Sequence, residues 1–414
     1  MSLDDLAPSI ALLGNSERGP EGFPNPPAFR LTVLLGAGSS LYAKAPSTED
    51  LTRMVERRQV GGAILRALRS RFESQSANFE DVLHVLEELD SLATSSDRAP
   101  TMLRGFVRPI LSEVGASHGE IRNERFELME AIAEEFDMIN YDSSWRPLYN
   151  LLKPRLDIFD LDIFTLNYDL VSDVATYALS MLSGKKWFDG FGQMVYMRDA
   201  SGFRADQYAN WRPGWGHVYL THAHLHGALS YAYYGSDMRM AHSAPLELVY
   251  TANLAAARET WAWARRVALA DPKADFRGVI PIVSGLRKME KLSAQPFANY
   301  YAGLAQALSK SPYLMIVGYG AGDEHINYWL REFTHIHNEN ARVVEIRKSA
   351  DSEQFTMQRA AAAYDLKWHK YKRLNDAYIS DAGIRCLTIT GGLTADREFN
   401  QRLINAQFTG ALRY

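Results

Sequence analysis

The chain is short of cysteine, of long apolar runs and of charge of one sign. Its 414 residues include a single cysteine, Cys386, which excludes an internal disulfide and a four-cysteine zinc site. No apolar stretch approaches the ~20 residues that a membrane-spanning helix needs. A net charge of -4 gives no sign of a broadly basic nucleic-acid surface. These absences favour a reducing compartment, and we expect a cytoplasmic protein without a signal peptide or a membrane anchor.

The order of the predicted elements indicates the fold class. A chain of this length suggests two or three domains, or one α/β core with large insertions. Strand-type apolar runs alternate with helix-spaced segments, which predicts a Rossmann-like α/β fold: a parallel sheet with helices on both faces. The predicted strands are 31–35, 158–166, 218–225, 313–317, 342–346 and 384–390. The predicted helices are 47–55, 63–72, 79–92, 102–114, 122–136, 171–184, 296–308, 323–336 and 395–406, and 245–269 is expected to be partly helical. Ser47 with Asp50 resembles a capping box that opens the first of these helices.

One of these strands ends abruptly in polar residues. The run from Asp162 to Leu166 is followed by Asn167 and Asp169, which alternation points to the same side. Ligands of open α/β sheets bind beyond the carboxyl ends of the strands. The amide offers a neutral donor and acceptor and the carboxylate a charged acceptor, so the pair could hold a polar ring substituent and a water. The same residues also fit a plain Asx-type turn.

Glycine-rich turns follow two other predicted strands. Gly36-Ala37-Gly38 comes directly after the first strand, where backbone amides could approach a pyrophosphate. The third glycine of a dehydrogenase fingerprint is replaced by Leu41, so a standard hydride-transfer signature is absent. The second turn runs from Gly318 to Asp323, and we expect Asp323 to cap the helix behind it. Either turn could also be an ordinary βα connection.

Three histidines alternate along the strand predicted at 218–225. Alternation places His222, His224 and His226 on one side, which raises the alternative of a metal-dependent hydrolase. A catalytic metal site needs about three protein ligands, and no further signature supports one. We therefore expect His222 and His224 to be structural and no metal to be bound. His226 ends the strand before Gly227, where it could serve as a general acid or base.

These pieces occur in a specific order. Gly-Ala-Gly-x-Ser at 36–40, Thr-x-Asn-x-Asp at 165–169, Leu-His-Gly at 225–227 and Gly-Tyr-Gly…Asp at 318–323 resemble the sirtuin-like NAD-binding superfamily. The chain looks most like the sirtuin-like NAD hydrolases of bacterial anti-phage defence. The resemblance covers residues 30–350, with a helical insertion at 55–155 and an aromatic, Gly-rich insertion at 186–220, expected to be irregular or a hairpin. It leaves a leader at 1–29 and an extension at 351–414 that completes the fold.

The resemblance implies roles for individual residues. Asn167 and Asp169 would hold the nicotinamide ribose, the carboxamide and a water of the substrate NAD+, and His226 would be the catalytic histidine. The residues implied for the pyrophosphate and nearby ribose are Gly36, Ala37, Gly38 and Ser40. Those implied for the adenosine half are Gly318, Tyr319 and Asp323, with Glu345 as a ribose partner.

Departures from the deacetylase branch bear on the reaction. The zinc cysteines of the deacetylases are missing, and Pro46 is followed by Ser-Thr-Glu instead of Asp-Phe-Arg. Leu166 also replaces the glutamine usual before the asparagine. We therefore expect cleavage of the nicotinamide–ribose bond by water, with protein deacylation or non-catalytic binding of NAD or ADP-ribose as alternatives. The resemblance further implies a homo-oligomer, and a separate activating subunit such as a HerA-type ATPase (translocase) or a short Argonaute, with nucleic acid contacted only indirectly.

Overall fold

The computed structural model gives the fold over a defined part of the chain. It describes residues 29–71, 76–94, 109, 111–198, 204–211, 220–234, 247–251, 258, 261–262, 296–347, 371–374, 377–381, 385–389, 392–394 and 397–409. The predicted leader, except for Phe29, and most of the predicted helix 102–114 lie outside these residues. Among the described helices, none combines the length and the apolar content needed to cross a bilayer.

The core is a Rossmann-like parallel sheet. Seven strands run parallel in the order β13-β10-β9-β1-β2-β6-β3, and β12 and β11 extend the β13 edge in antiparallel pairing. Leaving out the two-residue β3, the chain order is the 3-2-1-4-5-6 of doubly wound dinucleotide-binding folds, which confirms the predicted fold class. The strands are β1 Phe29–Leu35, β2 Phe159–Thr165, β3 Trp187–Phe188, β6 Leu220–His224, β9 Tyr313–Val317, β10 Arg342–Ile346, β11 Tyr371–Leu374, β12 Ala377–Asp381 and β13 Arg385–Ile389.

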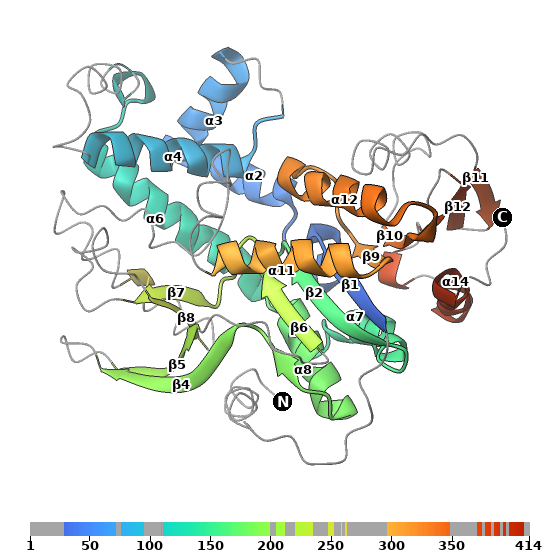
Figure 1. Ribbon diagram of the computed structural model, residues 1–414. Helices are drawn as coiled ribbons and strands as arrows, with labels where there is room; N and C mark the ends of the chain where they lie inside the picture. The colour runs from blue at the N-terminus through green and yellow to red at the C-terminus, as the bar shows by residue number, and fades with distance from the viewer. Residues whose placement is uncertain are drawn as a thin grey trace.

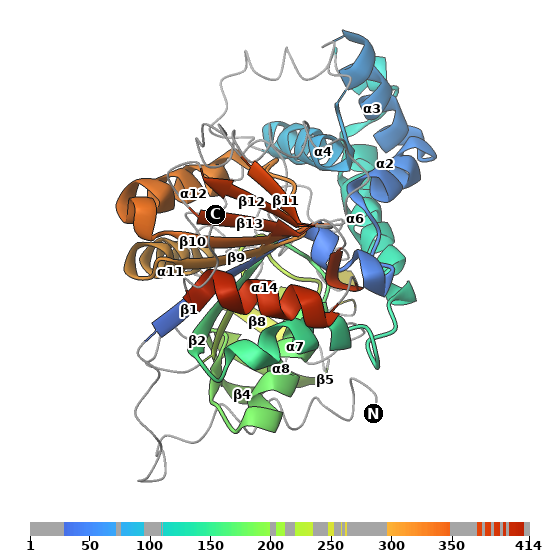
Figure 2. The same ribbon diagram turned by 90° about the vertical axis from the view of Figure 1, so that its right-hand side faces the viewer.

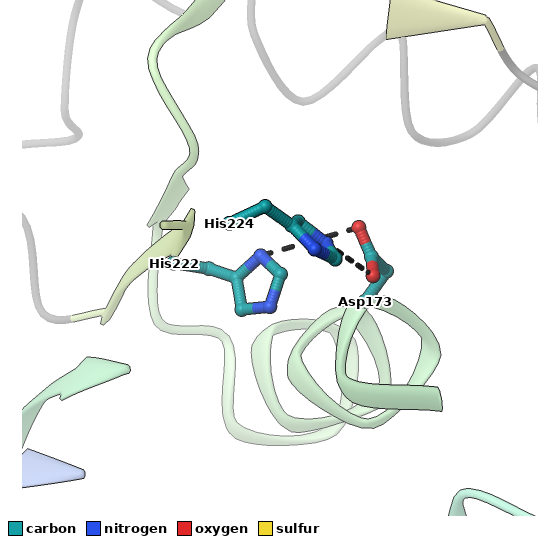
Figure 3. A group of neighbouring side chains, drawn as sticks. All are labelled: Asp173, His222 and His224. Atoms are coloured by element: carbon teal, nitrogen blue, oxygen red, sulfur yellow. Dashed lines mark hydrogen bonds and ion pairs between the residues drawn. The ribbon is translucent and has the colours of Figure 1, made fainter. Parts of the chain in front are cut away.

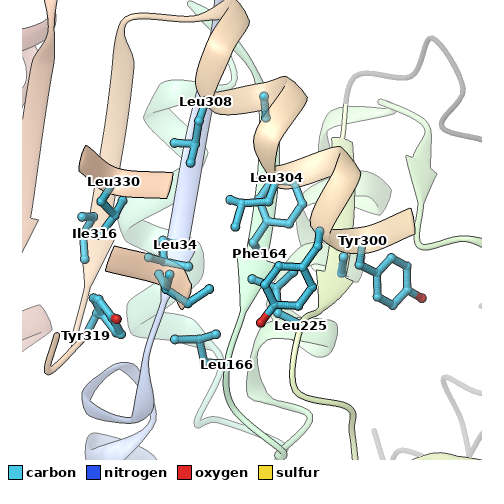
Figure 4. Packing of buried hydrophobic residues seen from close by; sticks show 14 of the residues in the cluster. Leu34, Phe164, Leu166, Leu225, Tyr300, Leu304, Leu308, Ile316, Tyr319 and Leu330 are labelled. Atoms are coloured by element: carbon cyan, nitrogen blue, oxygen red, sulfur yellow. The ribbon is translucent and has the colours of Figure 1, made fainter. Parts of the chain in front are cut away.

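Helices cover both faces of this sheet (Figures 1 and 2). Strand alternation sends Leu34 and Phe164 to the face under α11 and α12, where they pack with Leu304 and Leu330 (Figure 4). The intervening residues, such as Val33, pack on the opposite face against α7, α8 and α14. These helices are α7 Arg146–Leu152, α8 Val171–Ser183, α11 Phe297–Lys310, α12 Glu324–His337 and α14 Arg397–Thr409.

A helical layer lies beyond the carboxyl ends of the strands (Figure 2). Its helices are α2 Thr48–Glu56, α3 Gln59–Arg71, α4 Phe79–Thr94 and α6 His118–Glu135, inserted between β1 and β2. The predicted capping box is confirmed: the Asp50 amide donates to Ser47 Oγ at 3.2 Å, and the Ser47 amide donates to Asp50 Oδ2 at 2.9 Å. The layer shares a buried cluster with Tyr168 and Leu229, which follow β2 and β6. The helical layer therefore covers the carboxyl ends of β2 and β6, which the sequence analysis identified as candidate sites.

A second sheet was only partly predicted. Strands β4 Phe191–Arg198 and β5 Arg204–Trp211 form the hairpin expected within 186–220. They join β7 Tyr231–Tyr234 and β8 Glu247–Thr251 in an antiparallel sheet of order β4-β5-β8-β7. In the segment 245–269, expected to be partly helical, residues 258, 261 and 262 are helical, but Glu247–Thr251 form β8, whose edges pair with β5 and β7. Such long-range pairing overrides local propensity.

Candidate functional site

The four strand ends singled out by sequence belong to four adjacent strands. The order β9-β1-β2-β6 brings together the glycine turn after β1, Asn167 after β2, His226 after β6 and the glycine turn after β9. The chain leaves β1 toward β2 and later returns to β9 on the other side of β1. A topological switch point of this kind is where open α/β sheets bind ligands.

Asn167 is held by the loop after β1. Its Nδ2 donates to Ser39 Oγ and to Ser40 Oγ, both at 2.9 Å. The side chain is buried, and its Oδ1 has no hydrogen-bond partner among the described residues. A buried amide oxygen left unpaired costs about 1–3 kcal/mol. The amide is thus oriented by its donor end, with its acceptor end available to a ligand.

The backbone of Asn167 is fixed from the other side. Its carbonyl oxygen accepts from His224 Nδ1 at 3.0 Å, and its amide donates to Thr165 Oγ1 at 3.1 Å. Asp169, two residues on, is buried and accepts from the Val171 amide at 2.9 Å. Burial raises the pKa of Asp169, while hydrogen bonds from Val171 and Ser40 lower it in part. The Asx-type turn is therefore present, and both polar side chains after β2 are buried.

The two glycine turns pack against each other. A Cβ on Gly36 would lie 2.6 Å from Tyr319 Cα, and one on Gly38 would lie 2.8 Å from Gly318 Cα. Gly318 has φ +66°, and a Cβ there would collide with the backbone of Gly38 and Ser39. These glycines are therefore required by backbone contact between the turns, a reason independent of any phosphate.

The amides of the first turn are largely engaged within the protein. Gly36 donates to the Val317 carbonyl at 2.9 Å, Gly38 to that of Gly318 at 2.9 Å, and Ser40 to that of Ala37 at 3.1 Å. The segment continues as the short 3-10 turns Ala37–Ser39 and Leu41–Ala43 before α2 begins. Helix α2 begins at Thr48, which confirms the helix predicted at 47–55, and Ala37 is the exposed residue of the turn.

The second turn is organised around Tyr319. The buried Tyr319 hydroxyl accepts from the Asp323 amide at 3.2 Å and contacts Asn327 Oδ1 at 2.9 Å. Asn327 Nδ2 in turn donates to the carbonyl of Ala321, which has φ +55°. Asp323 occupies the N-cap position of α12, but its side chain makes no capping hydrogen bond, so the predicted cap is wrong in that respect.

His226 lies against the start of α12. Its Nε2 is 3.2 Å from Nε2 of His325, and the Asp323 carboxylate completes a group whose ligand-type atoms lie within 4.8 Å of one another. His226 is buried, whereas His325 and Asp323 are partly exposed. Two neutral imidazoles in this contact need opposite tautomers, one donating from Nε2 and one accepting there.

His222 and His224 form a different cluster (Figure 3). His224 Nε2 contacts Asp173 Oδ2 at 2.8 Å, and His222 Nε2 contacts Ser172 Oγ at 3.0 Å. All of these side chains are buried. Strand β6 ends at His224, so alternation does not extend to His226, and the expectation of three histidines on one side is wrong.

The charge state of this second cluster follows from its partners. His224 faces a carbonyl through Nδ1 and a carboxylate through Nε2, so both ring nitrogens must donate. Burial lowers the pKa of His224, but Asp173 and the two hydrogen bonds outweigh it and raise the value overall. Burial raises the pKa of Asp173, but the two histidines outweigh it and hold the value below its usual range. His224 and Asp173 are thus a buried ion pair, while burial keeps His222 neutral, its pKa lowered to about 4.

Glu345 lies apart from these groups. It is buried on β10, which β9 separates from β1. Its carboxylate is engaged by Arg347 and by Thr388 Oγ1, the latter at 3.4 Å. The contacts of Glu345 are thus with its own strand's end and with β13.

Residues missed by sequence reasoning complete the site. Ser39 shares the Asn167 amide with Ser40, and its place inside the Gly-Ala-Gly-Ser-Ser run was the available signal. His325 and Tyr301 carry no such signal, because only folding brings α11 and α12 to the end of β6. The ring of Tyr301 lies 5.7 Å from that of His325, and its buried hydroxyl has no hydrogen-bond partner among the described residues.

Comparison with known proteins adds no identification. No protein-family model matches the chain, and no curated protein matches it.

Proposed function

We propose that this chain is an NAD+ glycohydrolase, which cleaves the nicotinamide–ribose bond to give nicotinamide, ADP-ribose and a proton. The observation that carries the proposal is the Asn167 side chain: buried at the switch point of a 3-2-1-4-5-6 sheet, oriented by two serines, with Oδ1 unpaired among the described residues. Dinucleotides bind at this position in such sheets. The order of motifs that resembles the sirtuin-like family supports the same substrate.

Asn167 suits the substrate's ribose. The unpaired Oδ1 can accept from a ribose hydroxyl or from the attacking water, neither of which the amide could bind if its oxygen were already used. Cleavage of a glycosidic bond passes through an oxocarbenium-like state, so the ribose and the water must be held in place while charge develops. The fixed backbone and the fixed donor end of Asn167 give the rigidity that such positioning needs.

His226 suits the proton transfer. Water that attacks the ribose carbon must lose a proton, and a neutral imidazole is the commonest acceptor in proteins. His325 contacts one ring nitrogen of His226, an arrangement in which a second group orients the base. Asp169, near Ser40, would hold the nicotinamide ribose or carboxamide together with Asn167.

The two glycine turns suit the pyrophosphate and the adenosine half. Several amides of the first turn already donate within the protein and the Ser40 hydroxyl donates to Asp169, so the exposed Ala37 and the Ser39 hydroxyl are the groups left to approach phosphate, with Ser40 beside them. A hydroxyl that accepts from Asn167 keeps its own hydrogen to donate. Gly318, Tyr319 and Asp323 would border the adenosine, with Glu345 as the more distant ribose partner.

The test is nicotinamide release by the purified chain, together with binding of NAD+ measured by calorimetry. We expect Asn167→Ala and His226→Ala to lower the rate about 10²–10⁴-fold, the usual contribution of general-base assistance and positioning. Asn340→Ala and His335→Ala are matched controls, because both residues are exposed and neither follows the carboxyl end of a strand.

Three outcomes would contradict the proposal. Wild-type rates in Asn167→Ala or His226→Ala would remove the assignment of these residues. Binding of NAD+ that Asn167→Ala weakens, without nicotinamide release by the wild-type chain, would favour the alternative of a non-catalytic NAD or ADP-ribose module. Release that requires an acylated lysine peptide would favour a deacylase.

The wider setting of the reaction rests on the family resemblance alone. Depletion of NAD would harm the host cell, so we propose that the enzyme is the restrained effector of an anti-phage defence system in the cytoplasm. The corresponding partners are further copies of this chain and a separate HerA-type ATPase or short Argonaute, through which nucleic acid would act indirectly. Native mass spectrometry of the chain with and without the product of its neighbouring gene would test this assembly.

A further inference from the structure

We propose that His226, Asp323 and His325 form a binding site for a divalent transition-metal ion, Zn²⁺ in the first instance, and that the bound ion blocks His226. Two imidazole nitrogens and one carboxylate oxygen, from the segment after β6 and the start of α12, converge here, with all ligand-type atoms within 4.8 Å of one another. The ion site is independent of the proposed function; only its inhibitory effect rests on that function.

The distance between the two imidazoles fits shared coordination. The Nε2 atoms of His226 and His325 are 3.2 Å apart. Tetrahedral Zn²⁺ with Zn–N bonds of about 2.0–2.1 Å places two ligand nitrogens about 3.3 Å from each other. The same spacing is at the long end for an N–H···O or N–H···N hydrogen bond. The rings therefore need almost no movement to bind one ion through both nitrogens.

The ligand set selects the class of metal. Two imidazoles with one carboxylate suit Zn²⁺ and its transition-metal neighbours, whereas Mg²⁺ and Ca²⁺ prefer oxygen ligands throughout. Three protein ligands leave a fourth position for water. The carboxylate also offsets the positive end of the α12 dipole, since Asp323 occupies the N-cap without capping it.

Tyr301 supplies a second, independent indication of a ligand. Its hydroxyl is buried and has no hydrogen-bond partner among the described residues, while its ring lies 5.7 Å from that of His325. A neutral hydroxyl in this place can bond to water on the ion, the kind of outer partner that metal sites require.

The two histidine clusters differ in their access to an ion. His325 and Asp323 are partly exposed, so an ion can enter from solvent. Asp173, His222 and His224 are also close enough for a metal, but all are buried and His224 is bonded through both nitrogens. An ion there would have to break the ion pair and the bond that holds Asn167. The proposal is therefore confined to the His226 group.

A bound ion would withdraw His226 from catalysis. With the metal on Nε2 and the ring hydrogen on Nδ1, neither nitrogen of His226 has a lone pair left to accept a proton from water. NAD hydrolysis would then be restrained while Zn²⁺ is bound. The ion takes the place of the hydrogen that lies between the two Nε2 atoms. This requires only that the ring donating that hydrogen change tautomer, so that both rings carry their hydrogen on Nδ1.

The experiment is a Zn²⁺ titration of the full-length chain after chelator treatment, with a chromogenic chelator as competitor. We expect one ion per chain in the wild type. His325→Ala should weaken binding at least ~100-fold, beyond the 10–100-fold typical of losing an outer partner, and Tyr301→Phe should weaken it about 10-fold. His335→Ala, an exposed histidine on the same helix, should bind like the wild type. Mg²⁺ should not compete.

The outcomes separate the ion site from the proposed function. Equal Zn²⁺ affinity in the wild type, His325→Ala and His325→Gln, with unchanged circular dichroism, would overturn the site. If nicotinamide is released, its inhibition midpoint for Zn²⁺ should rise at least tenfold in His325→Gln; an unchanged midpoint would overturn the blocking of His226. Binding that depends on His325 in a chain without nicotinamide release would support the ion site and count against the glycohydrolase.

Discussion

Two histidine clusters lie two residues apart in the chain and have opposite characters. His222 and His224 on β6 are buried with Asp173, and each has a hydrogen-bond partner on α8. His226, just past the strand end, contacts His325 at a position that solvent can reach. The difference arises where β6 ends, because the chain turns there and directs the third histidine toward α12 instead of α8.

This comparison separates support from chemistry. The closed cluster, formed by Asp173, His222 and His224, fixes the backbone of Asn167 through His224 Nδ1. It therefore positions a residue proposed to bind the substrate without contacting the substrate itself. The open cluster, formed by His226, Asp323 and His325, contains the proposed general base, His226. A side chain bonded on all sides contributes stability and orientation, whereas proton transfer requires a group with access to its partner. Substitutions in the two clusters should therefore have different signatures.

The largest effect on stability is expected for Asp173→Ala. It leaves the buried His224 imidazolium without its counter-ion, and breaking a buried pair costs about 3–5 kcal/mol. Asp173→Asn should cost less, because neutral His224 can keep its bond to the Asn167 carbonyl and accept from the new amide. Urea denaturation of the full-length chain measures both. Exposed ion pairs contribute at most about 1 kcal/mol to the free energy of unfolding. A loss smaller than that in Asp173→Ala would contradict a buried ion pair between Asp173 and His224.

The next largest effect is a dependence of the unfolding free energy on pH, caused by His222. Its folded pKa is lowered to about 4 by burial, while the unfolded value is 6.5. Only the unfolded state takes up a proton between these values, so stability falls as pH falls through this window, by about 3 kcal/mol. His224, with its raised pKa, loses its contribution only as pH rises, and Asp173 loses its own only as pH falls below its ordinary range.

His222→Gln isolates that contribution. The amide keeps a hydrogen bond to Ser172 but does not titrate, so the variant should lose about 3 kcal/mol less than the wild type between pH 6.5 and 4. Unfolding free energies at several pH values in this window give the difference, in which other groups cancel. Parallel curves for the two proteins would show that His222 is not held neutral by burial.

A smaller loss of stability is expected from a substitution in the turn 318–323, which leads to Asp323 of the open cluster. Gly318→Ala introduces a Cβ at φ +66° that collides with the backbone of Gly38 and Ser39, which should cost about 2 kcal/mol or more. Gly322→Ala is the matched control in the same turn, since its Cβ would meet nothing within 4 Å. Thermal unfolding compares the two. Equal midpoints would mean that the turns do not interlock as described.

The sequence predicted the fold better than it predicted the detailed contacts of the candidate site. Parallel strands with flanking helices follow from apolar periodicity, and the capping box at Ser47 follows from local chemistry. The second sheet, β11 and β12 depend on pairing between distant residues, which periodicity does not encode. The strand ends were identified as sites because they are polar or rich in glycine. The reason for the glycines was missed, because it lies in the contact between two turns 280 residues apart in the sequence, Gly38 and Gly318.

The smallest effect on stability is expected for His325→Ala. It removes one contact to His226 from a partly exposed side chain, and losing one such hydrogen bond costs about 0.5–1.5 kcal/mol. Asp173→Ala should cost several times more in the same urea titration. If His325→Ala were as costly as Asp173→Ala, the open cluster would be a structural one, and its histidines would be poor candidates for a base or for metal ligands. A small cost, together with a loss of Zn²⁺ affinity, is the combination that only a functional cluster predicts.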